Sequence, residues 1–201
     1  MTESRVALDA DELMHLALHA TNQNQPEQAI THLKRVLELT PANGKAFYLL
    51  GALHAEIGLY ERAIDEMTRA VELEPDLSTA HFQLGLLYIT SGLVDEAEQA
   101  WRPLDSLGED DPLYLFKRGM LHLVRDEFEA CIADLNRGIE ANTMNEDLNN
   151  DMRRVAGSAE EALRARQGAP AAEAPEPASP AAGGGRHILL SAYQRDDDNT
   201  H

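Results

Sequence analysis

The chain has 201 residues, of which 43% are hydrophobic and only 5% aromatic, a composition that favours helices packed through Ala and Leu over a β-sandwich. Its 35 acidic and 17 basic residues give a formal net charge of −18, which excludes nucleic acid and anionic lipid surfaces as expected partners. Cys131 is the single cysteine, so neither an internal disulfide nor a cysteine-rich zinc site is expected. The N-terminus has no apolar leader pattern and no segment is long and apolar enough to span a bilayer, so we expect a cytoplasmic protein without membrane insertion.

After a short N-terminal arm (residues 1–9), the sequence repeats itself at an interval of 34 residues. Each unit carries a glycine or alanine in its first half, and a small residue followed by a large apolar one in its second half. The recurring columns are Ala17, Gly51, Gly85 and Gly119; Ala29, Ala63, Ala97 and Cys131; Leu33, Met67, Trp101 and Leu135; and Pro41 and Pro75.

This pattern resembles the tetratricopeptide repeat family, whose units are 34-residue helical hairpins. The resemblance covers residues 10–143 as four units, 10–43, 44–77, 78–111 and 112–143. The last two units depart from the family pattern, with Glu109 and Thr143 in place of prolines, Arg118 at a usually apolar position and Gly138 at a small one. The resemblance implies an all-α fold, an α-solenoid of four stacked hairpins.

Helix ends can be placed within the units. Phe47, Leu50 and Leu53 form an apolar stripe that Gly58 ends, and a second helix is predicted over 60–73 before Pro75. In the third unit, Pro103 lies inside a helix predicted over 94–106 and is expected to kink it or loosen its middle.

Residues 144–167 are predicted to cap the open end of the fourth unit. Ser158 with Glu161 resembles a capping box, which predicts a division of this cap at Gly157. The apolar stripe is Leu148, Met152, Val155 and Ala159, and the polar faces are expected to carry Asn145, Asn149, Asn150 and Asp151.

The remainder of the chain has a different composition. Residues 168–185 are rich in Ala, Pro and Gly and are predicted to be a disordered linker. Residues 186–201 form a short apolar and acidic tail segment, for which two interpretations remain open: a frayed terminus without function, or a tethered docking peptide for the solenoid's own groove or for a partner. The docking residues would be Ile188, Leu189, Leu190 and Tyr193.

The family resemblance implies that the first helix of each hairpin lines a concave groove. The side chains expected there are apolar or aromatic, which suits an amphipathic helix or an extended apolar peptide. The alternative is that some of them are core residues. The predicted groove residues are Met14, Leu18, Tyr48, Leu49, Ala52, Phe82, Leu86, Ile89, Phe116, Lys117, Met120 and Leu123, and two further members of the same columns are Thr21 and Ala55.

Other chemistry has little support. The carboxylate clamp of the family's chaperone-binding members needs polar and cationic side chains, but Met14 and Leu18 stand at the first-unit positions. His15 and His19 have a spacing that can hold a metal ion, yet no third ligand is identifiable by spacing. No glycine-rich phosphate loop follows a strand. We therefore expect no enzyme activity, no metal site and no cofactor.

The predicted function is that of a scaffold or adaptor that binds a protein or peptide, with its own C-terminal segment as one candidate. Two alternatives remain open. One is a secretion or assembly chaperone that shields an apolar segment of a client, as small acidic tetratricopeptide chaperones do. The other is an accessory targeting subunit of an enzyme on another chain.

Overall fold

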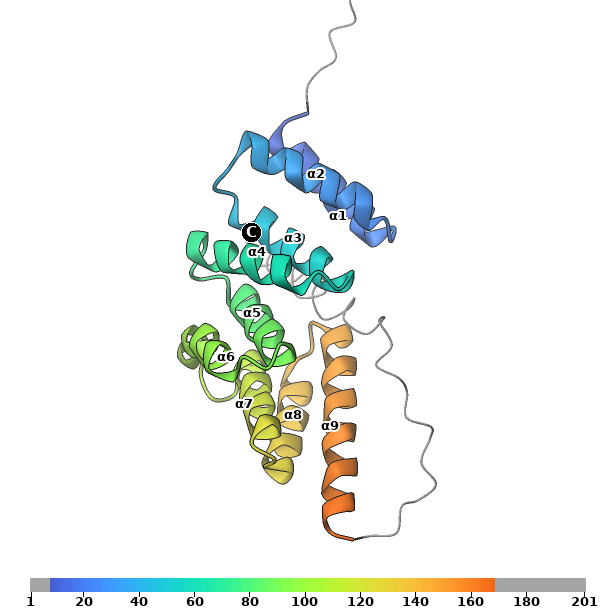
Figure 1. The fold of residues 1–201 in the computed structure, drawn as a ribbon, viewed down its shortest axis with the longest axis vertical. Coiled ribbons are helices and arrows are strands. Elements are labelled where there is room, and N and C mark those ends of the chain that lie inside the picture. The colour runs from blue at the N-terminus through green and yellow to red at the C-terminus, as the bar shows by residue number, and fades with distance from the viewer. Residues whose placement is uncertain (1–7, 169–201) are drawn as a thin grey trace, which may run out of the picture.

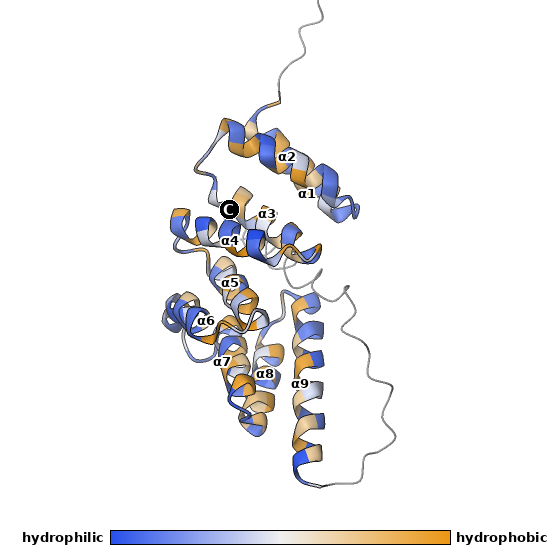
Figure 2. Cartoon of the chain, viewed as in Figure 1, coloured by the Kyte–Doolittle hydropathy of each residue, from blue (hydrophilic) through white to orange (hydrophobic). Residues whose placement is uncertain are grey.

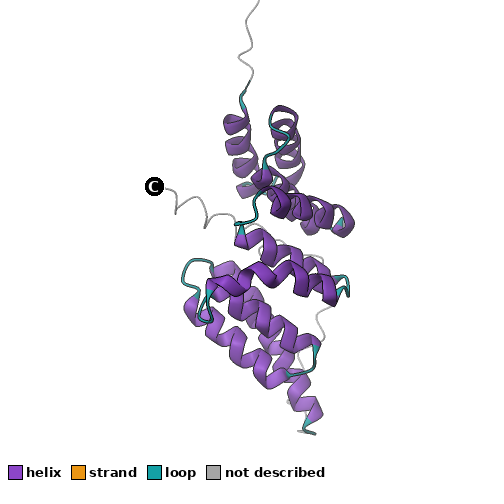
Figure 3. Cartoon of the chain, turned by 90° about the vertical axis from the view of Figure 1, so that its left-hand side faces the viewer, coloured by secondary structure: helices purple, strands orange, loops and turns teal. Residues whose placement is uncertain are grey.

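A computed structural model describes residues 8–168 of the chain. Over this range the fold is entirely helical, and the predicted all-α solenoid is confirmed (Figures 1 and 3). The predicted linker, the segment 186–201 and most of the N-terminal arm lie outside the described residues.

Helices alternate along the chain in antiparallel pairs. In the first two hairpins the second helix packs against its own first helix and against the first helix of the next hairpin, whereas the third hairpin contacts the fourth through its first helix and a short 3₁₀ helix. The pairs thus stack into a row (Figure 1). The hairpins are α1 (Ala10–Asn22) with α2 (Pro26–Leu39), α3 (Gly44–Glu56) with α4 (Tyr60–Leu73), α5 (Ser78–Thr90) with α6 (Val94–Trp101) and the 3₁₀ helix η1 (Arg102–Leu107), and α7 (Pro112–Val124) with α8 (Phe128–Ala141); α9 (Glu146–Arg166) then packs along α8.

The turn inside each hairpin has the same backbone conformation. One residue in each turn has a positive φ, between 56° and 78°, and these residues follow one another at 34-residue spacing. Asparagine, aspartate and glycine tolerate this left-handed region best, because they hydrogen-bond locally or lack a side chain. The four residues are Asn24, Gly58, Gly92 and Asp126.

Helix starts are fixed by side chains that accept hydrogen bonds from free backbone N–H groups. Asp9 and Glu12 form a reciprocal capping box at α1, with N–O distances of 2.8 and 3.0 Å. Asn43 caps α3 through the Ala46 N–H, and Asp111 caps α7 ahead of a proline at its first position.

The glycine column allows the two helices of a hairpin to approach closely, as predicted. A Cβ added at Gly119 would lie 2.6 Å from Leu135 Cδ2, and one at Gly51 would lie 2.9 Å from Met67 Cγ. At Gly85 an added Cβ would overlap the indole of Trp101, which is 1% exposed. The large residue of each second helix therefore fills the space that the glycine leaves.

The predicted disturbance at Pro103 takes the form of a change in helix type. The α-helix ends at Trp101, two residues before the proline, and the chain continues as a 3₁₀ helix to Leu107. Proline cannot donate to the preceding turn, which explains the change of helix type. Trp101 anchors this point, because its Nε1–H donates a 2.9 Å hydrogen bond to the carbonyl oxygen of Phe82.

The C-terminal helix differs from its prediction in two respects. The expected division at Gly157 is wrong: α9 is one continuous helix, and the Ser158 hydroxyl donates to the Arg154 carbonyl instead of capping a new helix. The prediction that Asn145, Asn149 and Asp151 lie on solvated faces is also wrong, since each is at most 6% exposed.

The buried asparagines hold the turn between α8 and α9. Asn142 Nδ2 donates to Asn149 Oδ1 at 2.9 Å and to the Asn145 carbonyl, and Asn149 Nδ2 returns a 2.8 Å bond to the Asn142 carbonyl. Asn145 Oδ1 caps α9 through the Leu148 N–H. Asp151 is paired with Arg154. Most of the polar atoms buried at this turn are thus hydrogen-bonded, while Asn142 Oδ1 and Asp151 Oδ2 have no hydrogen-bond partner among the described residues.

The buried apolar side chains form two clusters. One joins α1 to α5, and the other joins α5 to α9. Apolar segments recur along the inward sides of the helices (Figure 2). Both clusters include residues of α5, such as Leu84 in the first and Phe82 in the second.

Candidate functional site

The candidate site is a set of stripes on the first helices of the hairpins, which we call the inner face. Each stripe has residues at i, i+4 and i+7, and such residues lie on one side of a helix. All but the threonine are apolar or aromatic. The inner face consists of Met14, Leu18 and Thr21 on α1; Tyr48, Ala52 and Ala55 on α3; Phe82, Leu86 and Ile89 on α5; and Phe116, Met120 and Leu123 on α7.

Exposure along the inner face is uneven. The α1 stripe is half-buried, as are Leu86, Ile89 and Leu123. The α3 stripe is sealed, with Tyr48 and Ala52 at 0% and Ala55 at 4% exposure.

The prediction of exposed aromatic side chains in an open groove is therefore wrong for Phe82 and Phe116, which pack in the core at 0% exposure. Tyr48 is also at 0% exposure. The two phenylalanine rings lie 6.3 Å apart between centroids, and Phe82 stacks on Trp101 at 6.2 Å. Phe116 also fills the space beside Gly138, where a Cβ would approach its ring to 2.5 Å. The small residue at this position of the second helix is what allows the aromatic ring to turn inward.

Two further predicted groove residues point elsewhere. Lys117 is 6% exposed, and its ammonium donates to the Trp101 carbonyl at 3.2 Å and to Asp105 at 2.5 Å, both on the preceding hairpin. Leu49, at the same position of α3, is 1% exposed within the first core cluster. This column packs between hairpins, so neither residue lines a groove.

A polar network that the sequence did not reveal accounts for Arg118. Its guanidinium makes two 2.5 Å hydrogen bonds to the nearly buried carboxylate of Asp134 and stacks over Tyr114. The Asp134 hydrogen bonds raise the pKa of Arg118. Arg118, which stands at a usually apolar position of the repeat, therefore forms a bidentate ion pair with a buried carboxylate.

A related contact occurs two units earlier. His54 Nδ1 lies 2.5 Å from Glu66 Oε2, at positions equivalent to His122 and Asp134, which are 3.5 Å apart. Burial raises the pKa of Glu66, although its contact with His54 acts in the opposite direction. His54 is only 3% exposed, so it packs within the hairpin.

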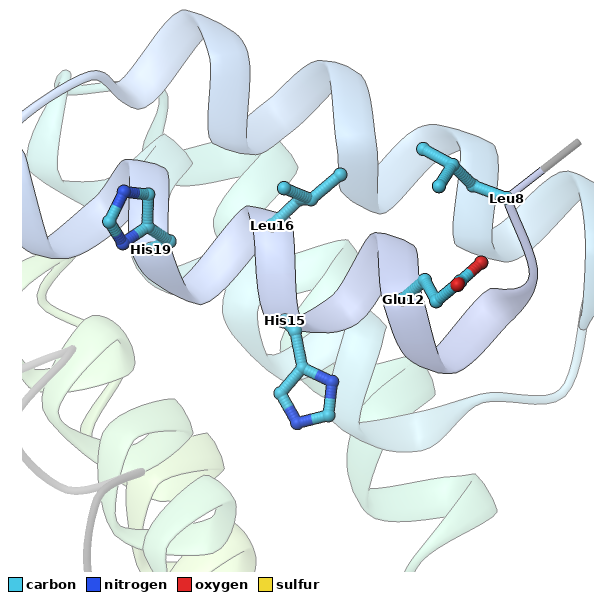
Figure 4. A pocket seen from close by; sticks show the side chains of 5 residues that line it. All are labelled: Leu8, Glu12, His15, Leu16 and His19. Carbon is cyan, nitrogen blue, oxygen red and sulfur yellow. The ribbon is translucent and has the colours of Figure 1, made fainter. Parts of the chain in front are cut away.

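A separate depression of about 540 Å³ lies on the outer side of α1 (Figure 4). It is lined by Leu8, Glu12, His15, Leu16 and His19. Glu12 belongs to the capping box, and His19 is bonded to Gln23 at 2.8 Å. The two histidine rings do not point toward one another (Figure 4).

Across residues 8–168, no three potential metal ligands come together. No helix in this part of the chain is both long and apolar enough to cross a bilayer.

Stacked helical hairpins with an apolar inner face define a repeat scaffold of the kind that mediates protein–protein interaction. The tetratricopeptide repeat family profile matches residues 15–78 and 60–102, and the chain is a tetratricopeptide repeat protein. The hairpin α7–α8 continues the same packing beyond the matched residues.

Solved structures with the same fold include three of particular interest. A crystal structure of MamA is 23% identical, with a TM-score of 0.56 over 66% of this chain and 77% of that one. YrrB, described as a TPR protein with an unusual peptide-binding site, is 18% identical, with a TM-score of 0.57 over 95% of this chain and 88% of that one. The APC/C hetero-tetramer Cut9–Hcn1 gives 18% identity and a TM-score of 0.68 over 78% of this chain, but only 30% of the matched one. No curated protein matches the sequence.

Proposed function

We propose that the chain is a non-catalytic scaffold that binds an apolar segment of another protein, as an amphipathic helix or extended peptide, along the inner face. The observation that carries this proposal is the composition of α3 and α5. Their apolar residues run around the whole helix circumference, and ten of 13 residues in α3 and eight of 13 in α5 are buried.

The second helices behave differently. Only three of 14 residues are buried in α2 and in α4, which have one apolar side and one charged side, as surface helices do. The first helices α3 and α5 also pack against the second helix of the preceding hairpin, which accounts for part of their burial. Leu86 and Ile89 on α5 stay half-buried after this packing, so they suit contact with a further partner surface.

The comparison with YrrB is consistent with this proposal, because that relative has a peptide-binding site on the same fold. The half-buried apolar side chains of the inner face are Met, Leu and Ile, which are of the kind that receives an amphipathic helix in an apolar groove. A partner segment with Leu or aromatic residues at i, i+3 or i+4, and i+7 would fit such a surface.

The test is selection of peptides from a displayed random library on the full-length protein, followed by affinity measurement on variants. Leu86→Asp places a charge on the half-buried part of the inner face and should weaken the selected peptides about 30-fold, a loss of about 2 kcal/mol. Leu39→Asp, at a 48% exposed leucine at the end of α2, is the matched control and should bind like wild type.

Ile89→Ser, one turn further along α5, provides a second inner-face variant if Leu86→Asp loses helicity. Equal affinities for the inner-face variants and the control would refute the proposal, as would selection of polar peptides only.

A further inference from the structure

The stripe on α3 is buried along its whole length, unlike the equivalent stripes on α1, α5 and α7. One side of α3 packs on α4 through Gly51 and Met67, and another faces α2 through Leu49. The third side carries Tyr48, Ala52 and Ala55, all at most 4% exposed. On the internal hairpins the equivalent stripes stay half-buried at Leu86 and Ile89 of α5 and at Leu123 of α7, so the same repeat packing leaves part of this surface accessible elsewhere.

We propose that the segment Arg186–Arg195 of the same chain occupies the inner face at α3 and α5, in competition with the partner protein. This inference rests on the proposed function, since it identifies what the partner must displace. The segment lies outside the described residues.

The sequence of this segment fits such a site. Arranged as a helix, the segment would have one apolar side, because Leu189 and Leu190 precede Tyr193 by four and three residues. Ile188 and Ala192 would extend this apolar side. The polar residues His187, Ser191 and Gln194 would lie on the opposite side. No proline or glycine occurs from Arg186 to His201. The helix breakers thus stop where the apolar side begins.

The connecting chain is long enough. The described part ends at Gly168, just beyond α9, whose first turn lies level with α5 and whose last turn lies at the far end of the stack (Figure 1). A return along α9 covers about 31 Å at 1.5 Å per residue. The 17 residues from 169 to 185 span up to about 56–61 Å when fully extended. Tethering of this kind gives an effective concentration in the millimolar range, so a weak contact suffices for occupancy.

Charge also favours one orientation. Lys45 lies in the first turn of α3 and Glu56 in its last. The segment begins with Arg186 and is followed by Asp196-Asp197-Asp198. Antiparallel to α3, its basic start would lie near Glu56 and its acidic end near Lys45, and opposite charges attract.

The test measures access to the α3 stripe by thiol labelling. Cys131→Ala removes the native thiol at a position where three other units already have alanine, and Ala52→Cys places a single thiol on the stripe. The full-length protein should react slowly with a maleimide. Adding Leu189→Asp and Leu190→Asp should accelerate labelling at least tenfold, whereas Ala181→Asp and Ala182→Asp in the linker should leave the rate unchanged.

A synthetic peptide of residues 186–198, added to the Leu189→Asp/Leu190→Asp protein, should restore slow labelling. Circular dichroism checks that each variant keeps its helicity. Slow labelling that persists in Leu189→Asp/Leu190→Asp would overturn the inference, because the described helices would then seal the stripe themselves. A rate that depends on protein concentration would point to a second copy and would also overturn it. The proposed function stands separately, since library peptides sensitive to Leu86→Asp would support it in either case.

Discussion

The substitution Gly85→Ala provides a direct check on the packing of the third hairpin. An added Cβ would overlap Nε1, Cε2 and Cδ1 of Trp101, a side chain that is 1% exposed and hydrogen-bonded to the Phe82 carbonyl. Overpacking of this kind costs about 1–3 kcal/mol, and loss of the indole hydrogen bond costs about 1 kcal/mol more. The higher helix propensity of alanine returns about 1 kcal/mol. The expected net loss is therefore about 2 kcal/mol.

Gly157→Ala is the matched control, because this glycine also lies inside a helix but a Cβ there meets nothing within 4 Å. The same chemical change should stabilise the protein by about 0.5–1 kcal/mol through helix propensity alone. The two substitutions should thus have opposite signs.

Both variants can be measured by urea unfolding followed by circular dichroism, with fluorescence of Trp101, the single tryptophan, as a local probe. Gly85→Ala should lower the midpoint and shift the emission to the red as the indole leaves its site, while Gly157→Ala should raise the midpoint with unchanged emission. If Gly85→Ala were as stable as wild type with Trp101 emission unaltered, the close helix approach described here would be wrong.

Three further predictions concern other parts of the fold. Burial, with a contribution from Asp134, raises the pKa of Cys131 to about 11, so only about one thiol in a thousand is ionised at pH 8. A disulfide reagent should therefore react with Cys131 only after denaturation, and rapid reaction of the folded protein would contradict this. Asp134→Ala leaves the Arg118 guanidinium without its bidentate partner and should lower the free energy of unfolding in urea by about 1–3 kcal/mol. The double change Asp134→Ala with Arg118→Leu should recover part of this loss, and additive losses would exclude coupling between the two residues. Asn149→Ala breaks two buried hydrogen bonds to Asn142 and should lower the free energy of unfolding by about 1–3 kcal/mol. Amide hydrogen exchange should then be faster in α9 than in α3, and uniform exchange in both helices would argue against a local role.

Much of the backbone could be predicted from the repeat interval. Gly85 and Trp101 occur in columns that require close helices, and Pro103 cannot continue an α-helix, so both features follow from local chemistry. The turn at Gly58 was also visible. Its equivalents Asn24 and Asp126 carry side chains and become recognisable only when aligned at the same interval.

The surroundings of individual side chains were less accessible to sequence reasoning. Periodicity identifies which residues share a side of a helix, but it does not say which neighbour covers that side. Phe82 and Phe116 were therefore assigned to an open groove, although Trp101 and Gly138 make room for them inside. Lys117 looked like a free cation because Asp105, its partner, lies in the irregular part of the preceding hairpin.

The prediction for the asparagines at the α8–α9 turn was wrong for a related reason. A polar residue in an amphipathic pattern is normally assigned to solvent, and Asn149 satisfies its amide through the backbone of Asn142 instead. Hydrogen bonds of this kind depend on turn geometry that no spacing rule specifies.

The division of the core into two clusters that meet at the third hairpin has a mechanical consequence. Because contacts in a stacked array are made between neighbours, cohesion between the two halves depends on this hairpin, whose helix α5 contributes buried residues to both clusters. Local unfolding of α1 or α2 would not extend to α8, whereas a destabilising change near α5 would let the two halves unfold separately. The chain therefore has a seam at its midpoint, and stretching or proteolysis should open it there first.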